Sequence, residues 1–169
     1  MKSILTTLFL SLCSFVLNAQ TTNDVSSKPS LQGVWQMCNP TGNYLATNPQ
    51  TGEITLDTTK LQPVYFYKVF GNKDELTAMF ITPVLSLITI SGTYEVLSPN
   101  QYIEHVDYHS NPNYTNRDIT LDYTFITDDY VLSSYKNEMG MTAQEVWKRL
   151  KQGNPATELN KLKEAGIIK

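Results

Sequence analysis

The amino-acid sequence predicts an all-β protein, an eight-stranded up-and-down antiparallel barrel followed by a short C-terminal helix. Three observations lead to this prediction. Short segments alternate between apolar and polar residues and are rich in β-branched and aromatic side chains. Clusters of Gly, Pro, Asn and Asp separate these segments at spacings typical of hairpins. A helical pattern appears only near the C-terminus.

The expected strands share this alternation and the flanking turn residues, and the fourth is expected to bend at Gly92. Eight antiparallel strands in an open sheet would leave two unpaired edges, and closure into a barrel removes both. We expect strands at residues 31–38, 62–70, 75–82, 85–97, 101–109, 118–126, 130–136 and 142–150.

The chain begins with the pattern of a secretory signal. Lys2 precedes an apolar run that is too short for a membrane-spanning helix, and Ala19 provides a small residue for cleavage. We therefore expect an exported protein, periplasmic or extracellular, with no transmembrane segment. An alternative is lipoprotein anchoring through Cys13, since LSLC resembles an acylation box, but Leu12 is bulky where a small residue is expected.

The remaining chain fits one domain. We expect a linker at residues 20–30, the barrel at 31–150, and a C-terminal helix and tail at 151–169, after a signal peptide at 1–19. The net charge of −3 and the absence of a basic stripe argue against a nucleic-acid partner. Once the signal is removed Cys38 is the only cysteine, which excludes an intrachain disulfide and fits a small buried residue.

Two segments depart from the strand pattern. Residues 39–60 are long, polar and rich in turn formers, and they fit either a lid across one end of the barrel or a disordered or weakly paired excursion. In the tail, Asn154 fits an N-cap, Pro155 the first helical position and Gly166 a C-terminal stop. Leu159 and Leu162 would give this helix an apolar stripe able to pack on a sheet.

Closure of the barrel would bring the first strand beside the last. Alternation puts Gly33 and Trp35 on one face of the first strand, and Trp147 and Arg149 on one face of the last. If these faces meet, Arg149 lies over the Trp35 ring in a cation–π contact and Gly33 relieves crowding there. In the alternative, the two tryptophans are unrelated core residues.

These residues carry a resemblance. Gly33-x-Trp35 near the mature terminus, with an arginine ending the final strand, resembles the structural signature of lipocalins. The blocks LQGVW, ITISGTYEVLSPNQYIEHV and EVWKRL resemble an uncharacterised lipocalin-like family of exported bacterial proteins, described only as a domain of unknown function. The resemblance covers Leu31 to Leu150 and implies an up-and-down barrel able to hold an interior pocket, but no activity.

An eight-stranded barrel is either filled by side chains or able to hold one small ligand. Tyrosines that point inward would give the lumen apolar walls with hydrogen-bonding hydroxyls, although half-exposed outer positions suit tyrosine equally well. Glu104 would need a partner inside the barrel, for which Arg149 is a candidate, or would face solvent. The candidate lumen residues are Tyr65, Tyr67, Tyr94, Tyr102, Glu104, Tyr108 and Tyr123.

The sequence does not predict a metal site, a cofactor or a catalytic centre. His105 and His109 are four residues apart, which on a strand is about 13 Å and too far for one metal ion. No nucleophile elbow, phosphate-binding glycine loop or Cys-x-x-Cys motif is present.

The favoured interpretation is a non-enzymatic barrel that binds a small, apolar or amphipathic ligand. The alternative is a solid barrel that acts as a structural or interaction module through residues 39–60 or an outer face. A third hypothesis is a hydrolase or isomerase that uses Glu104 with a tyrosine as acid and base. The sequence leaves the oligomeric state open.

Overall fold

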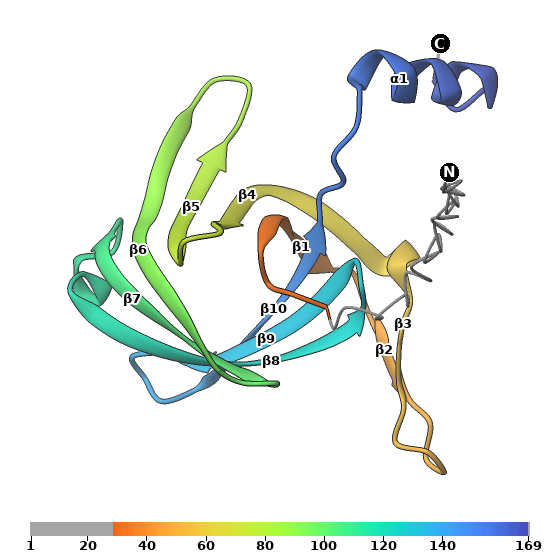
Figure 1. Ribbon diagram of the computed structural model, residues 1–169. Helices are drawn as coiled ribbons and strands as arrows, with labels where there is room; N and C mark the ends of the chain where they lie inside the picture. Colours follow the sequence, from red (N-terminus) through yellow and green to blue (C-terminus); the bar gives the residue numbers. More distant parts are fainter. Residues whose placement is uncertain (1–28, 169) are drawn as a thin grey trace, which may run out of the picture.

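Eight strands close into one antiparallel barrel in the order β1, β10, β9, β8, β7, β6, β5, β4 (Figure 1). The computed structural model describes residues 29–168, so the expected signal peptide and Cys13 lie outside the described residues. The barrel strands are β1 (Gly33–Pro40), β4 (Leu61–Phe70), β5 (Glu75–Ile81), β6 (Ser86–Ser98), β7 (Gln101–His109), β8 (Arg117–Thr127), β9 (Tyr130–Lys136) and β10 (Thr142–Arg149). The predicted fold class is confirmed, and each expected strand is present with its ends shifted by at most two residues.

The two ends of the barrel differ. Turns from β4 to β5, from β6 to β7 and from β8 to β9 surround one end, which we call the filled end. The β5–β6 hairpin, the β7–β8 connection with a 3₁₀ helix η2 (Pro112–Tyr114), and the β9–β10 turn surround the other, which we call the open end.

Trp35 and Arg149 close the filled end. They are paired across β1 and β10, the Trp35 side chain is fully buried, and the guanidinium carbon lies 4.1 Å from the centroid of its ring. Arg149 donates hydrogen bonds to the carbonyls of Ser30, Gln32 and Asp128. Arg149 thus joins the segment before β1 to the turn between β8 and β9.

Gly33 is required beside this contact. Its φ of +128° lies in a region that favours glycine, and a Cβ built there would be 3.0 Å from Nη1 of Arg149. Glycine therefore accommodates the backbone conformation at the start of β1 and leaves room for the guanidinium of Arg149.

Aromatic side chains fill the rest of this end. Tyr94 contacts Phe70 edge to face at 4.9 Å between ring centroids. Phe70 and Tyr123 each lie 5.6 Å from Tyr102. The series continues through Phe125 to Trp35. A void of only about 10 Å³ remains between these residues and their neighbours, too small for a ligand.

Residues 39–60 form neither a lid nor a disordered excursion. They contain strands β2 (Leu45–Thr47) and β3 (Ile54–Leu56), paired as a hairpin, and the 3₁₀ helix η1 (Thr58–Lys60). Tyr44 and Leu56 pack on a small outer cluster of Cys38, Leu61 and Val146. The base of this segment therefore packs on the outer wall of the barrel, and its exposed tip at residues 46–53 projects away from it (Figure 1). The lid interpretation is wrong, and the short hairpin fits the weakly paired excursion.

A bulge where β6 meets β7 changes which side chains face inward. The pairing runs from Ser91↔Tyr108 to Gly92↔Val106, so Asp107 is an extra residue in β7. A Cβ at Gly92 would come within 2.0 Å of the His105 carbonyl oxygen, so only glycine permits this close approach. Beyond the bulge, Tyr108 lies outside and His109 lines the lumen.

The C-terminal helix α1 (Pro155–Glu164) forms as predicted, with the Asn154 side chain accepting a hydrogen bond from the backbone N–H of Ala156. None of its residues is buried, and Leu159 and Leu162 remain partly exposed. The expectation that these leucines dock on the sheet is therefore wrong, and the helix extends away from the barrel (Figure 1).

We predict that Arg149→Ala lowers the free energy of unfolding by about 2 kcal/mol, because the variant loses both the cation–π contact and hydrogen bonds from a charged donor. Urea denaturation measures the change. Lys151→Ala is the control, since its ion pair with Asp129 is at the surface and contributes less than about 1 kcal/mol. Equal, small losses in both variants would contradict this role of Arg149.

Candidate functional site

A cavity of about 190 Å³ occupies the open half of the barrel. Its lining residues come from six of the eight barrel strands and from η2, and they combine apolar and aromatic walls with several ionisable groups. We call it the open-end cavity, and it is lined by Phe66, Lys68, Ile90, Glu104, His109, Tyr114, Ile119, Leu121, Tyr135 and Glu145.

A buried ion pair lies at the base of the open-end cavity. Nζ of Lys68, on β4, is 2.7 Å from Oε1 of Glu104, on β7, and both side chains are at most 5% exposed. The Tyr102 hydroxyl donates a second hydrogen bond to the same carboxylate oxygen, at 3.1 Å. Lys68 lines both the small void of the filled end and the open-end cavity, so the pair marks the boundary between the two halves.

The charges of this pair stabilise each other in a site that excludes water. Burial lowers the pKa of Lys68, but the carboxylates of Glu104 and Glu145 outweigh burial and hold that pKa above its usual value. Burial and the neighbouring Glu104 raise the pKa of Tyr102 well above its usual value. At neutral pH Lys68 is therefore charged, and Tyr102 is a neutral hydrogen-bond donor.

Glu145 is a second carboxylate on the wall of the open-end cavity. Its Oε2 accepts a hydrogen bond of 3.0 Å from the indole Nε1 of Trp147. Burial, followed by the charge of Glu145, raises the pKa of the nearby Tyr135 hydroxyl. The cavity thus contains acceptors at Glu104 and Glu145 and a neutral phenol at Tyr135.

His109 lies near the mouth of the cavity, beside Tyr114 at 5.0 Å between ring centroids. Burial lowers the pKa of His109, and the charge of Lys68 acts in the same direction against an opposing effect of Glu104. The backbone N–H of Asn111 donates to Nδ1 at 2.8 Å, which places the proton of the neutral ring on Nε2.

Of the seven side chains expected in the lumen, only Glu104 lines the open-end cavity. Tyr94, Tyr102 and Tyr123 are inside the barrel but belong to the packed filled end, and their hydroxyls donate to Gly71, Glu104 and Ser98 respectively. Their contact with a ligand stays a prediction that this packing disfavours.

The inward orientation expected for three tyrosines is wrong. Tyr65 and Tyr108 are 54% and 49% exposed on the outside. Tyr67 also lies outside, where its hydroxyl accepts a hydrogen bond from Gln36. Phe66, Lys68 and Phe70 occupy the inner face of β4 instead, and the bulge at Asp107 moves Tyr108 outward.

Lys68, which lines the cavity and pairs with Glu104, is not among the residues expected from the sequence. The candidate partner of Glu104, Arg149, instead hydrogen-bonds backbone carbonyls at the filled end. The alternation Phe66, Lys68, Phe70 in QPVYFYKVF already placed a lysine on an aromatic face. A lysine between two phenylalanines on one face of a strand indicates a buried charge, which requires an ionic partner.

The two histidines lie on opposite sides of the barrel wall. Nδ1 of His105 is 2.8 Å from Asp118 on the outside, whereas His109 lines the open-end cavity. Within residues 29–168, no group of three or more His, Cys, Asp or Glu side chains is placed to hold a metal ion.

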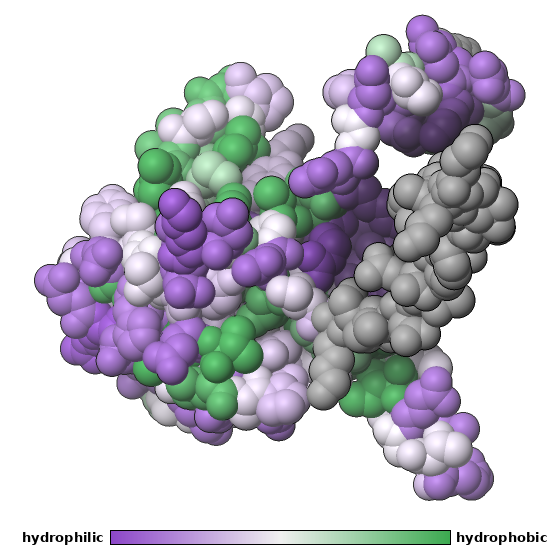
Figure 2. Space-filling model, viewed as in Figure 1, coloured by the Kyte–Doolittle hydropathy of each residue, from purple (hydrophilic) through white to green (hydrophobic). Residues whose placement is uncertain are grey.

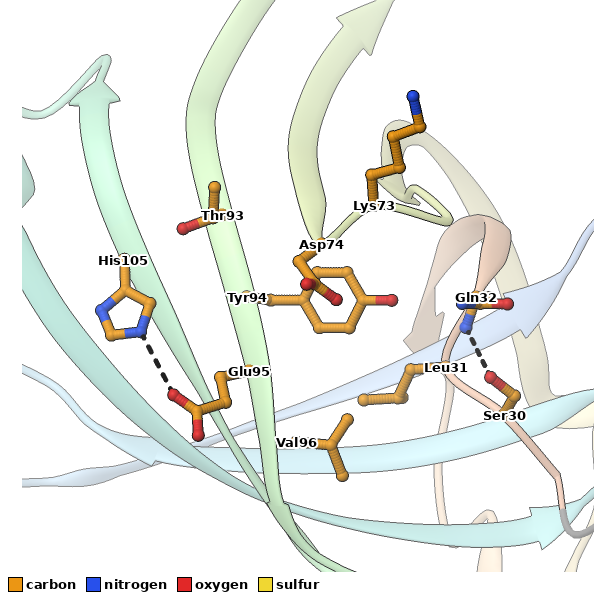
Figure 3. A pocket seen from close by; sticks show the side chains of 10 residues that line it. All are labelled: Ser30, Leu31, Gln32, Lys73, Asp74, Thr93, Tyr94, Glu95, Val96 and His105. Atoms are coloured by element: carbon orange, nitrogen blue, oxygen red, sulfur yellow. Dashed lines mark hydrogen bonds and ion pairs between the residues drawn. The ribbon is translucent and has the colours of Figure 1, made fainter.

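A cleft larger than the open-end cavity lies outside the barrel, at the rim of the filled end (Figure 3). Leu31 and Tyr94 border it on one side, and His105 and Glu95 face each other on the other side, 4.0 Å apart. The cleft is shallow, and its charged groups are exposed to water, which screens them. The open-end cavity is less open to solvent and contains a buried ion pair, so it is the stronger candidate for ligand binding.

The family model described as "Domain of unknown function (DUF4488)" matches residues 30–157. A comparison with curated proteins finds no match. The closed eight-stranded barrel is consistent with the lipocalin-like resemblance. In the described part of the chain, no helix has the length and apolar character needed to cross a membrane.

We predict that Lys68→Met lowers the free energy of unfolding by about 3–5 kcal/mol, because Glu104 would remain buried without its cation. The double variant Lys68→Met/Glu104→Leu should recover most of this loss, since no unpaired charge remains. Urea denaturation tests both. Lys60→Met, which breaks an exposed pair with Asp57, is the control, and a loss as small as in that control would contradict the account.

Stability should also fall as the pH drops below about 6.5. The pKa of His109 is lower in the folded state, so the unfolded chain takes up the proton first and is favoured in acid. His109→Gln should remove this contribution, whereas His105→Gln should retain it. Denaturation of the three proteins between pH 5 and 8 tests the prediction, and parallel curves for wild type and His109→Gln would disprove it.

Proposed function

This chain belongs to the family of the domain of unknown function DUF4488, and we propose that it is an exported barrel protein that binds one small, partly apolar molecule in the open-end cavity. Export is proposed from the signal pattern of residues 1–19. The observation on which binding rests is that side chains fill only one half of the barrel.

The mixture of apolar and polar residues in the cavity wall supports the binding of a small molecule. Its apolar residues, such as Ile90 and Ile119, provide contact area, while Lys68, Glu104 and Glu145 provide a few polar groups inside. Such a combination is typical of small-molecule sites. A buried ion pair can often be replaced by apolar residues without loss of stability, so its presence beside a cavity favours a role in recognition over one in folding.

The surface around the opening of the cavity also favours an apolar ligand. The β5–β6 hairpin beside it exposes large apolar side chains, and Figure 2 shows them as a green area over that hairpin. Exposed apolar groups of this kind commonly mark places where apolar molecules bind. The exposed residues are Ile81, Val84, Leu85, Leu87 and Ile88.

The alternative function, an interaction module, assumes that side chains fill the whole barrel. The open-end cavity disfavours this alternative. The hairpin β2–β3 is nevertheless accessible and borders an outer cleft of about 290 Å³ against the β8–β9 turn. Removal of residues 43–57 would leave small-molecule binding intact under our proposal.

We predict that Ile119→Trp abolishes ligand retention by filling the open-end cavity. The protein is purified from an extract of the producing cells, and native mass spectrometry detects any small molecule that it retains. The wild type should carry an added mass that denaturation releases, and Ile119→Trp should carry none.

Thr120→Trp is the matched control, because the neighbouring residue on β8 points outside. It should retain the ligand as the wild type does. A retained mass that survives in Ile119→Trp, or a wild type that retains nothing from such extracts, would contradict the proposed function.

A further inference from the structure

The charged groups that line the open-end cavity do not balance. Lys68 contributes one positive charge, and its contact at 2.7 Å with Glu104 neutralises it. His109 is neutral at physiological pH, since burial lowers its pKa. Glu145 adds a further carboxylate, so the cavity has an excess of one negative charge.

Glu145 is the carboxylate whose charge is left without a cation in contact. Glu104 accepts hydrogen bonds from Lys68 and Tyr102, whereas Glu145 accepts one from the neutral indole of Trp147. Among the described residues, no Lys, Arg or His nitrogen lies within salt-bridge distance of Glu145. A ligand that supplies a positive charge would complete this site.

The size and walls of the cavity limit the rest of the ligand. A cavity of about 150 Å³ can hold benzene, so about 190 Å³ suits one ring with a short chain. Phe66, Tyr114 and Tyr135 provide aromatic surface, and Ile90 and Ile119 provide aliphatic surface. Aromatic faces near the charged group would also favour a cation.

We propose that the open-end cavity selects a small amphipathic amine, with its ammonium group at Glu145 and its apolar part between Phe66 and Ile119. A carboxylate of the same size would meet two carboxylates and only one ammonium, which is already paired. This inference rests on the proposed function, because it names the ligand class for the same cavity.

The test compares three probes of nearly equal size in titration calorimetry at pH 7 and low salt: 2-phenylethylamine, 2-phenylethanol and phenylacetate. The amine should bind at least tenfold more tightly than the alcohol, and the carboxylate more weakly than both. Glu145→Gln keeps the acceptor for Trp147 but removes the charge, so it should reduce the amine's affinity to that of the alcohol.

Glu95→Gln is the control, since it removes an exposed carboxylate on the outside of β6 and should leave all three affinities unchanged. If the alcohol binds but the carboxylate equals or exceeds the amine, or if Glu145→Gln preserves the amine's advantage, the ligand class is overturned and the proposed function stands. If none of the probes binds to the folded wild type, the ligand class and the proposed use of the cavity both fail.

Discussion

Strand β1 is hydrogen-bonded to β10 on one side and to β4 on the other, and this double pairing determines the inside of the barrel. Trp35 is level with Arg149 in one partner and with Lys68 in the other. Because side chains alternate along a strand, a slip of β1 by one residue would turn Trp35 toward water and away from the level of Arg149 and Lys68. The register of β1 therefore places Trp35 inside the barrel, beside Arg149 and level with Lys68 of the buried ion pair.

This register divides the lumen into two halves with different roles. Trp35 and the stacked aromatic residues leave almost no space at one end, which gives the barrel its stability. The open half retains a cavity large enough for a small molecule. Lys68 and Glu104 lie at the boundary, where they give the cavity a polar base without admitting water to the aromatic core. Any ligand is therefore confined to the half away from Trp35.

The strand count, the turns and the contact between Trp35 and Arg149 could be predicted from the sequence, because they depend on local alternation and on the need to close a sheet. The sequence could not predict which tyrosine side chains point into the barrel and which point out. In QPVYFYKVF both faces of the strand carry aromatic residues, so alternation alone did not show which face was inside. The outward orientation of Tyr108 results from a bulge in β7, where Gly92 of β6 lies close to the β7 backbone. The partner of Glu104 is 36 residues away in the chain, and only the tertiary structure brings Lys68 to it.

A small molecule binds, under this proposal, in the open half of the barrel. Intermolecular nuclear Overhauser effects between saturating 2-phenylethanol and the methyl-labelled protein test it most directly. The account predicts contacts to the methyl groups of Ile90, Ile119 and Leu121, which line the open-end cavity. Contacts restricted to Val84 and Leu87 on the exposed hairpin would instead locate the probe on the surface and contradict the account.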